Sequence, residues 1–219
     1  MWSSEVTNMI ITGIWETLYM TLVSTLVGYV IGLPMGIILT VSDKDGIKPN
    51  AVLYKILDVI ANIVRSVPFI ILLVLLIPFT RLVVGKSYGS TATIVPLVIA
   101  AAPYIARMVE SSLKEVDAGV IEAARSMGAS NFTIITKVML VEARTSLLVG
   151  ATITLGTILG YSAMSGAVGG GGLGAIAIRY GYTRWQTDIM IVTVILLIIL
   201  FQIFQTLSLI HISEPTRRS

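Results

Sequence analysis

Long uninterrupted runs of apolar residues are the dominant pattern in this 219-residue chain. Three of them, 17–41, 88–106 and 189–210, contain no Asp, Glu, Lys, Arg or His. Each run is long enough to cross the hydrocarbon core of a bilayer, about 30 Å thick, as an α-helix. Three such helices in so short a chain leave no polar surface to cover them. The pattern therefore predicts a membrane protein with several spans.

Two further spans follow from interrupted apolar stretches, so we expect an all-α membrane protein with about five transmembrane helices. The expected spans are roughly 17–41, 56–80, 89–108, 145–165 and 187–208. The second carries Asp58 and Arg65 near its start. The fourth apolar stretch is too long for one crossing and is broken by the glycine-rich run 169–174. We expect a span to about Ser165, then a tight turn and a short surface segment.

Composition supports the membrane assignment and excludes several classes of function. Charged residues make up 12% of the chain, about half of what soluble domains carry. The absence of cysteine excludes disulfide or thiol chemistry. The net charge of +3 is small and its basic residues are scattered, so we expect no nucleic-acid partner. The first sixteen residues lack Lys and Arg, so we expect no cleavable signal peptide.

Basic residues near the span ends predict the orientation, because cytoplasmic loops are enriched in Lys and Arg. With the N-terminus outside, the inner loops hold Lys44, Lys48, Lys55, Arg107, Lys114, Arg125, Lys137 and Arg144. The outer side then holds only Arg81, Lys86, Arg179 and Arg184. We therefore expect a multi-pass protein of the bacterial inner membrane with its C-terminus in the cytoplasm. The largest cytoplasmic loop is then 107–144.

This loop has the pattern of two short helices joined by a tight turn. Asp117 can cap a helix over about 118–127, which Gly128 can end in a left-handed conformation. Ser130 can cap a second helix that runs to about Leu140. Helical spacing places apolar residues on one side of each helix: Val120, Ile121, Ala124 and Met127 on the first, and Phe132, Ile135 and Val138 or Met139 on the second. The residues alone fit either a compact knob or an ordinary hairpin on the membrane surface.

The first of these helices contains Glu122, Ala123, Ala124, Arg125, Met127 and Gly128, followed by Ile135 and the run 137–143. This set resembles the Glu-Ala-Ala loop of ABC importer permeases. In that family the loop is the coupling helix, which docks into a groove on a cytoplasmic ATPase. The resemblance implies that these six residues couple the chain to its ATPase, with Glu122 and Arg125 orienting the contact. The sequence departs from the family pattern at Val141, where the family usually has Pro, so the bend after the second helix is open.

Other segments narrow the resemblance to permeases for methionine uptake. They are 63–73 with 77–81, 101–110, and 160–164, and the similarity covers about residues 12–205. The subfamily implies a homodimer of five-span subunits with an amino-acid path between them. It also implies two cytoplasmic ATPase subunits and a substrate-binding lipoprotein outside.

Few residues carry further chemistry. A formal G-x-G-x-x-G over 169–174 follows an apolar span rather than a strand, so we interpret it as a turn at the outer mouth of the path. No G-x-x-x-x-G-K-[ST] is present, so ATP hydrolysis is expected of a partner and the chain itself is not an enzyme. We expect no cofactor or metal. The charged residues near span ends are interpreted as interface anchors or subunit contacts rather than substrate ligands: Asp58, Arg65, Arg107 and Glu110.

The small residues of the fourth span leave room for a translocation path, to which we assign Tyr161, Ser162 and Met164, the last as a soft gate. We therefore expect a permease domain over 1–207, with the coupling loop at 117–143. The tail 208–219, which holds His211, breaks the pattern of the last span and is interpreted as non-native. Two alternatives stay open: a membrane scaffold without a path, and an ion-coupled secondary transporter. The second is disfavoured because the spans lack interior carboxylates.

Overall fold

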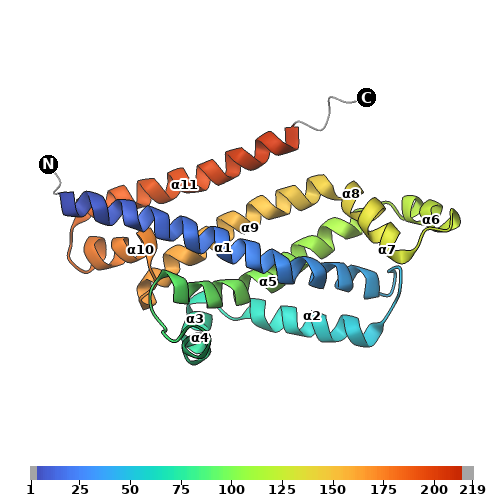
Figure 1. Cartoon of the computed structure of the whole chain (residues 1–219), viewed down its shortest axis with the longest axis horizontal. Helices are drawn as coiled ribbons and strands as arrows, with labels where there is room; N and C mark the ends of the chain where they lie inside the picture. Colours follow the sequence, from blue (N-terminus) through green and yellow to red (C-terminus); the bar gives the residue numbers. More distant parts are fainter. Residues whose placement is uncertain (1–3, 214–219) are drawn as a thin grey trace.

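The computed structural model describes residues 4–213, and within them every regular element is a helix (Figure 1). The long helices are α1 (Ser4–Ser42), α5 (Ser90–Lys114), α9 (Arg144–Ser165) and α11 (Thr187–Ser213). Shorter helices connect them: α2 (Ala51–Ser66), α3 (Phe69–Leu75), α4 (Ile77–Val84), α6 (Ala118–Ser126), α7 (Asn131–Thr133), α8 (Leu140–Glu142) and α10 (Gly172–Ile176). Within the described residues, four helices are long and apolar enough to cross a membrane, or five if α2 and α3 form one broken span.

The packing of α1 against α5 depends on three glycines spaced four residues apart. Gly28, Gly32 and Gly36 lie on the side of α1 that faces α5, and all three are buried. A Cβ atom on Gly32 would lie 2.6 Å from the carbonyl oxygen of Ala102, and one on Gly36 would lie 2.6 Å from that of Ala106. The missing side chains let the two backbones approach closely. Such small-residue contacts are a common way to pack membrane helices, since lipid offers no hydrophobic driving force between them.

The second expected span is not one continuous helix. The axes of α2 and α3 meet at 101°, where Pro68 follows Val67. Proline removes a backbone donor and forces the preceding residue out of the helical region, and Val67 is accordingly extended at φ −82° and ψ 124°. The span expected over 56–80 is therefore a broken one, with its bend at Val67 and Pro68.

The fourth apolar stretch ends as expected, but its continuation is buried. After α9 stops at Ser165, the chain turns through Gly169, at φ +85°, into α10 and a π-helical stretch, Ala177–Tyr182. Leu173 is fully buried, and the Gly172 N–H donates to Glu16 Oε2 at 2.7 Å. The Leu173 N–H donates to Thr17 Oγ1 at 2.9 Å. The expected surface segment is thus a packed element whose first turn is capped from α1.

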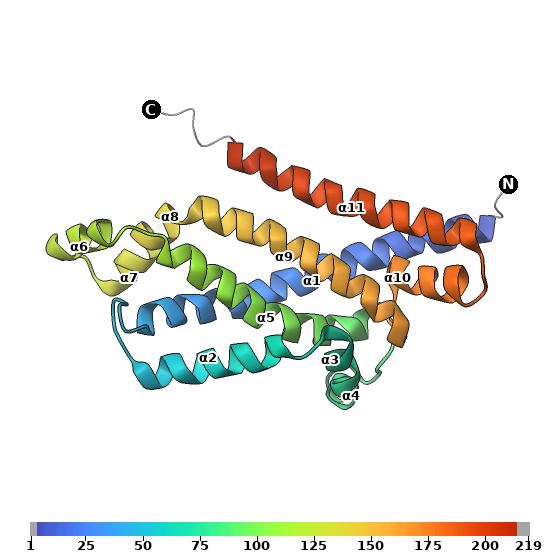
Figure 2. The same ribbon diagram turned by 180° about the vertical axis from the view of Figure 1, so that it is seen from behind.

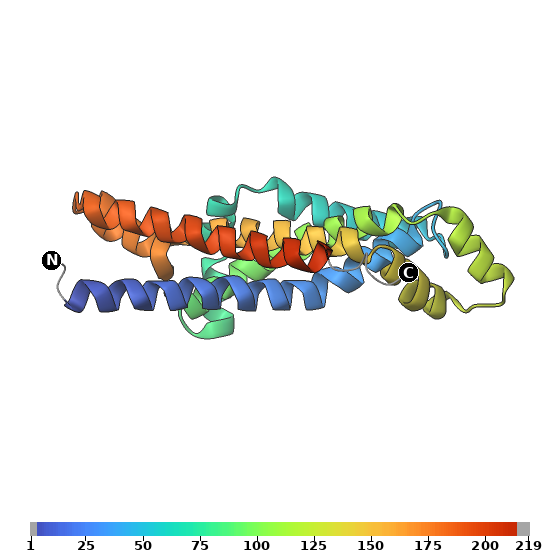
Figure 3. The same cartoon turned by 90° about the horizontal axis from the view of Figure 1, so that it is seen from above.

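The helices are ordered along the long axis of the molecule. The start of α1, α10 and the start of α11 lie at one end, and α6 and α7 lie at the other (Figures 1 and 2). From above, α1 and α11 run along the molecule in the same direction, while the α6–α7 region projects beyond the helix bundle (Figure 3). α1, α5 and α11 run toward the α6–α7 end, whereas α2 and α9 run back from it (Figures 1 and 2), so the chain passes back and forth along the molecule as successive membrane crossings must.

Candidate functional site

The 117–143 segment forms the two-helix knob at the projecting end of the molecule (Figure 3). Asp117 Oδ1 accepts a hydrogen bond from the Gly119 N–H at 2.7 Å and begins α6. Gly128 follows α6 in the left-handed region at φ +82°, and Ser130 Oγ accepts from the Thr133 N–H at 3.2 Å to begin α7. The predicted caps and turn are confirmed, and they fix the angle between the two helices.

The apolar residues of the segment divide into a buried set and an exposed set. Ala124, Ile134 and Met139 face the core and are at most 5% exposed. Met127 and Phe132 are 82% and 75% exposed. The apolar side predicted for each helix is therefore only partly buried: Ala124 and Met139 belong to the core, whereas Val120, Met127 and Phe132 are exposed. Outward apolar side chains at the tip of a membrane protein indicate a surface for a partner protein.

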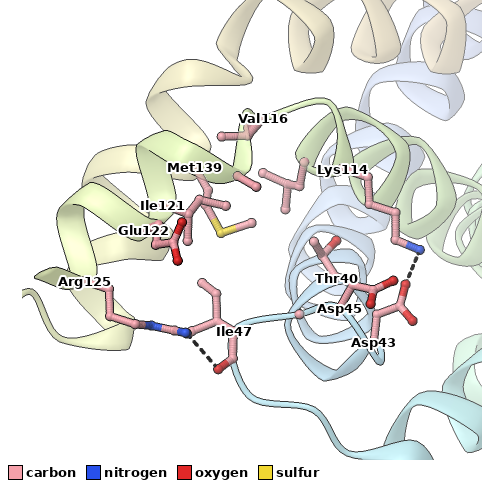
Figure 4. A pocket seen from close by; sticks show the side chains of 13 residues that line it. Thr40, Asp43, Asp45, Ile47, Lys114, Val116, Ile121, Glu122, Arg125 and Met139 are labelled. Carbon is pink, nitrogen blue, oxygen red and sulfur yellow. Dashed lines mark hydrogen bonds and ion pairs between the residues drawn. The ribbon is translucent and has the colours of Figure 1, made fainter.

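Glu122 and Arg125 border a cavity of about 540 Å³ between α6 and the loop that joins α1 to α2 (Figure 4). The Arg125 Nη2 group donates to the carbonyl oxygen of Ile47 at 3.1 Å. Arg125 therefore ties α6 to the α1–α2 loop within the chain, in addition to any contact it makes with a partner. Glu122 and Ala123 are exposed, so both are accessible at the projecting end of the molecule.

The bend after the second helix forms without proline. Val141 lies in α8 and is 50% exposed. The chain then bends at Ala143, whose φ of −78° and ψ of 0° separate α8 from α9. The bend therefore lies two residues after Val141, at the buried Ala143.

Three of the four charged residues singled out near span ends belong to one ion network. Arg107 forms an ion pair with Asp58, and its Nη1 atom lies 2.7 Å from Glu110 Oε2. The Lys114 Nζ atom lies 2.8 Å from Glu110 Oε1 and 2.6 Å from Asp43 Oδ2. The network joins α2, α5 and the α1–α2 loop, so these residues act as contacts within the subunit.

Two members of this region were missed by sequence reasoning. Asp43 and Lys114 lie 71 positions apart by number and meet only through the fold, although the i, i+4 spacing of Glu110 and Lys114 on α5 was visible in the sequence. The hydrogen bond from Lys114 holds the pKa of the Asp43 carboxyl below its ordinary value. The fourth charged residue, Arg65, joins no ion pair among the described residues and lies 6.0 Å from the ring centre of Tyr104.

The residues expected along the path differ in accessibility. Met164 is 52% exposed, and a Cβ on Gly160, four residues earlier on α9, would meet open space. Tyr161 is half-buried and stacks on Phe69 at 4.2 Å between ring centres. Ser162 is buried and its hydroxyl donates to the Leu159 carbonyl at 2.8 Å. Ser162 therefore does not reach the surface of the subunit.

Two other features concern cofactors and the tail. No group of His, Cys, Asp and Glu suited to a metal ion occurs within the part of the chain that the structure describes. The expected non-native tail begins inside α11, which continues to Ser213, and its last six residues, 214–219, lie outside the described residues.

Comparison with known proteins places this geometry in a family. Residues 28–215 match the family described as the binding-protein-dependent transport system inner membrane component. Over 206 residues the chain is 49% identical to the probable D-methionine transport system permease protein MetI of Vibrio cholerae, covering 94% of this chain and 92% of that protein. It is 53% identical over 158 residues to the D-methionine transport system permease protein MetI of Escherichia coli K12, covering 72% and 73%.

Solved structures agree with the sequence comparison. A chain of the MetNI methionine ABC transporter, in inward-facing conformations, superimposes with a TM-score of 0.96 at 50% identity, covering 99% of this chain and all of that one. An amino acid ABC transporter crystallised with histidines superimposes with a TM-score of 0.78 at 22% identity, covering 95% of this chain and 94% of that chain. At that lower identity the likeness concerns the fold alone.

Proposed function

Because this chain belongs to the family of inner-membrane components of binding-protein-dependent transport systems, we propose that it is the permease subunit of an ABC importer for methionine. The observation that carries the proposal is the 117–143 segment, a capped two-helix knob whose exposed apolar residues lie beyond the bundle. The relatives named for D-methionine transport support the substrate. The chain is a multi-pass membrane protein, and its own role is to provide the path.

The proposed assembly contains two copies of this chain, two cytoplasmic ATPase subunits and an external substrate-binding lipoprotein. ATP is hydrolysed by the ATPases. The 117–143 segment lies in the cytoplasm, which places the N-terminus outside and the end of α11 inside. The permease domain extends over 1–207. This arrangement is supported by the excess of basic residues at the knob end and by the alternating directions of α1, α2, α5, α9 and α11.

In the proposed cycle, ATP binding draws the two ATPases together and moves the segments seated on them. Glu122, Ala123, Ala124, Met127 and Gly128 form the docking helix and its end. The hydrogen bond from Arg125 to the α1–α2 loop passes this movement toward the membrane helices.

The ion pair between Lys114 and Asp43 links α5 to the same loop. The spans then tilt together, the path opens outward and methionine enters from the binding protein. Hydrolysis returns the dimer to its inward-facing form. Tyr161 and Met164 on α9 border the path in this proposal, with Met164 as the gate, and the buried Ser162 supports the helix behind them.

The test is ATP-driven uptake of labelled methionine by proteoliposomes that contain the permease, its ATPase and its binding protein. The Glu122→Lys variant should stay in the membrane and lose uptake, because a reversed charge opposes docking at the knob. A matched control, Glu5→Lys, reverses an exposed charge in the first turn of α1, at the end of the molecule opposite the knob, and should retain uptake.

Three other outcomes would contradict the coupling role or the class of transporter. Unchanged uptake by Glu122→Lys would contradict the coupling role. Uptake without ATP but with an ion gradient would indicate a secondary transporter. Absence of uptake by the wild-type assembly, with the ATPase still bound, would favour a scaffold.

A further inference from the structure

A small cavity lies where the second span breaks. It has a volume of about 170 Å³ and is bordered by the end of α2, the start of α3, α5 and α9. Its position at a broken helix is informative, because non-helical backbone at membrane depth is tolerated where it borders a cavity or is covered by protein. The volume is below the ~300–1,000 Å³ typical of sites for drug-sized ligands, which suits a single small molecule.

Arg65 is the charged group of this cavity. It lies seven residues beyond Asp58 on α2 and thus about 10 Å farther from the ion network along the helix. Among the described residues Arg65 has no acidic partner, whereas Arg107 and Lys114 each contact two carboxylates. Arg65 is exposed in the single subunit, so its guanidinium, which lacks a counter-ion near this span, is available to a ligand. Its planar guanidinium matches the geometry of a carboxylate.

The remaining walls of the cavity fit the rest of an apolar amino acid. Phe69 and Leu72 are at most 7% exposed, and the stacked rings of Phe69 and Tyr161 offer aromatic faces and edges. A thioether sulfur makes favourable contacts with such rings. The carboxyl-terminal end of α2 carries partial negative charge and can attract an ammonium group beside Arg65.

Tyr161 connects the cavity to the proposed path. Its ring borders the cavity, and on the same helix Gly160 and Met164 face open space and solvent. A molecule that passes along this side of α9 therefore meets the mouth of the cavity before it reaches the ion network at the cytoplasmic end.

We propose that this cavity is a transient binding site for the transported amino acid, in which Arg65 holds the α-carboxylate and the Phe69 side receives the apolar side chain. The inference rests on the proposed function, since it concerns the molecule carried along the path. It adds a binding step within the membrane to the recognition made by the external binding protein, and it predicts selection for a free carboxylate.

The experiment is photolabelling of the reconstituted permease–ATPase complex with a diazirine analogue of methionine, followed by mapping of the labelled peptides. Label is expected on the residues that border the cavity, and excess methionine should compete. Methioninol, which lacks the carboxylate, should compete at least tenfold less well. Arg65→Met should reduce the label at least tenfold, and Arg65→Lys should retain part of it. Arg81→Met, which removes an exposed arginine on α4, is the matched control and should label as the wild type does.

The variants are also assayed for basal ATP hydrolysis, which shows that the complex is folded and assembled. Undiminished label in Arg65→Met, label only outside the cavity, or equal competition by methioninol would each overturn the site while leaving uptake by the wild type intact. If the wild type itself neither labels nor takes up methionine, the proposed function fails and the site fails with it.

Discussion

The contact between α1 and α5 gives the sharpest test of the fold, because one added methyl group there has nowhere to go. In Gly32→Ala the new Cβ would lie 2.6 Å from the Ala102 carbonyl oxygen and 2.8 Å from Ile105 Cβ. Ordinary contacts begin at 3.4 Å, so the helices must separate by about 0.8 Å, the difference between 3.4 Å and 2.6 Å. The nearest atom belongs to the backbone and cannot rotate away.

Overpacking of this kind costs about 1–3 kcal/mol, and a clash with backbone lies at the upper end of that range. The higher helix propensity of alanine returns at most ~1 kcal/mol. We therefore expect a net loss of about 2 kcal/mol, or roughly 4–8 °C in the unfolding midpoint for a chain of this size. The measurement is tryptophan fluorescence during heating of the detergent-solubilised protein, with gel filtration to follow its oligomeric state.

Two further glycine variants make the reasoning refutable. In Gly28→Ala the nearest atoms are side-chain carbons at 2.9 and 3.0 Å, so the loss should be smaller. In Gly150→Ala the nearest atoms belong to flexible Met108 at 3.4 and 3.6 Å, so the midpoint should be unchanged or slightly higher. If Gly32→Ala melts at or above the wild-type temperature, the close approach of α1 and α5 is not the contact that stabilises the bundle.

Five other variants probe the ion network and the knob. Lys114 lowers the pKa of Asp43 from its ordinary value of 3.8. Above about pH 3.8 the wild type should therefore have a higher unfolding midpoint than Asp43→Asn. The difference between the two midpoints should shrink as the pH falls through the lowered pKa of Asp43. Arg107→Met should lower the free energy of unfolding by about 3 kcal/mol, because it leaves Asp58 without its cation and Glu110 with Lys114 alone. Arg107→Lys should cost less. Phe132→Ala, at a 75% exposed position, should reduce co-purification of the ATPase without changing the unfolding midpoint. Ile134→Ala, at a fully buried position, should lower the free energy of unfolding by ~2–4 kcal/mol. The opposite pattern would mean that the exposed and buried faces of the knob are exchanged.

Local signals in the sequence were sufficient for the membrane class and for the caps and turn of the knob. Apolar runs are read by length alone, because a bilayer demands about 20 residues per helical crossing. The caps at Asp117 and Ser130 and the left-handed Gly128 act on their immediate neighbours, so their pattern predicts the turn without knowledge of the rest of the chain. The assignment of the knob to ATPase coupling required the family resemblance as well.

Contacts between distant segments were decided only by the tertiary structure. Glu16 and Thr17 cap a helix 156 residues away, and this contact buries a segment that seemed to belong on the surface. Phe132 fits the apolar face of an isolated helix but is 75% exposed, whereas Ile134, two residues later, is fully buried. Periodicity states which residues share a face, whereas the choice of the face to bury depends on which partner helix arrives there. The same distinction applies to Arg65, whose charge is visible in the sequence but whose cavity exists only where four helices meet.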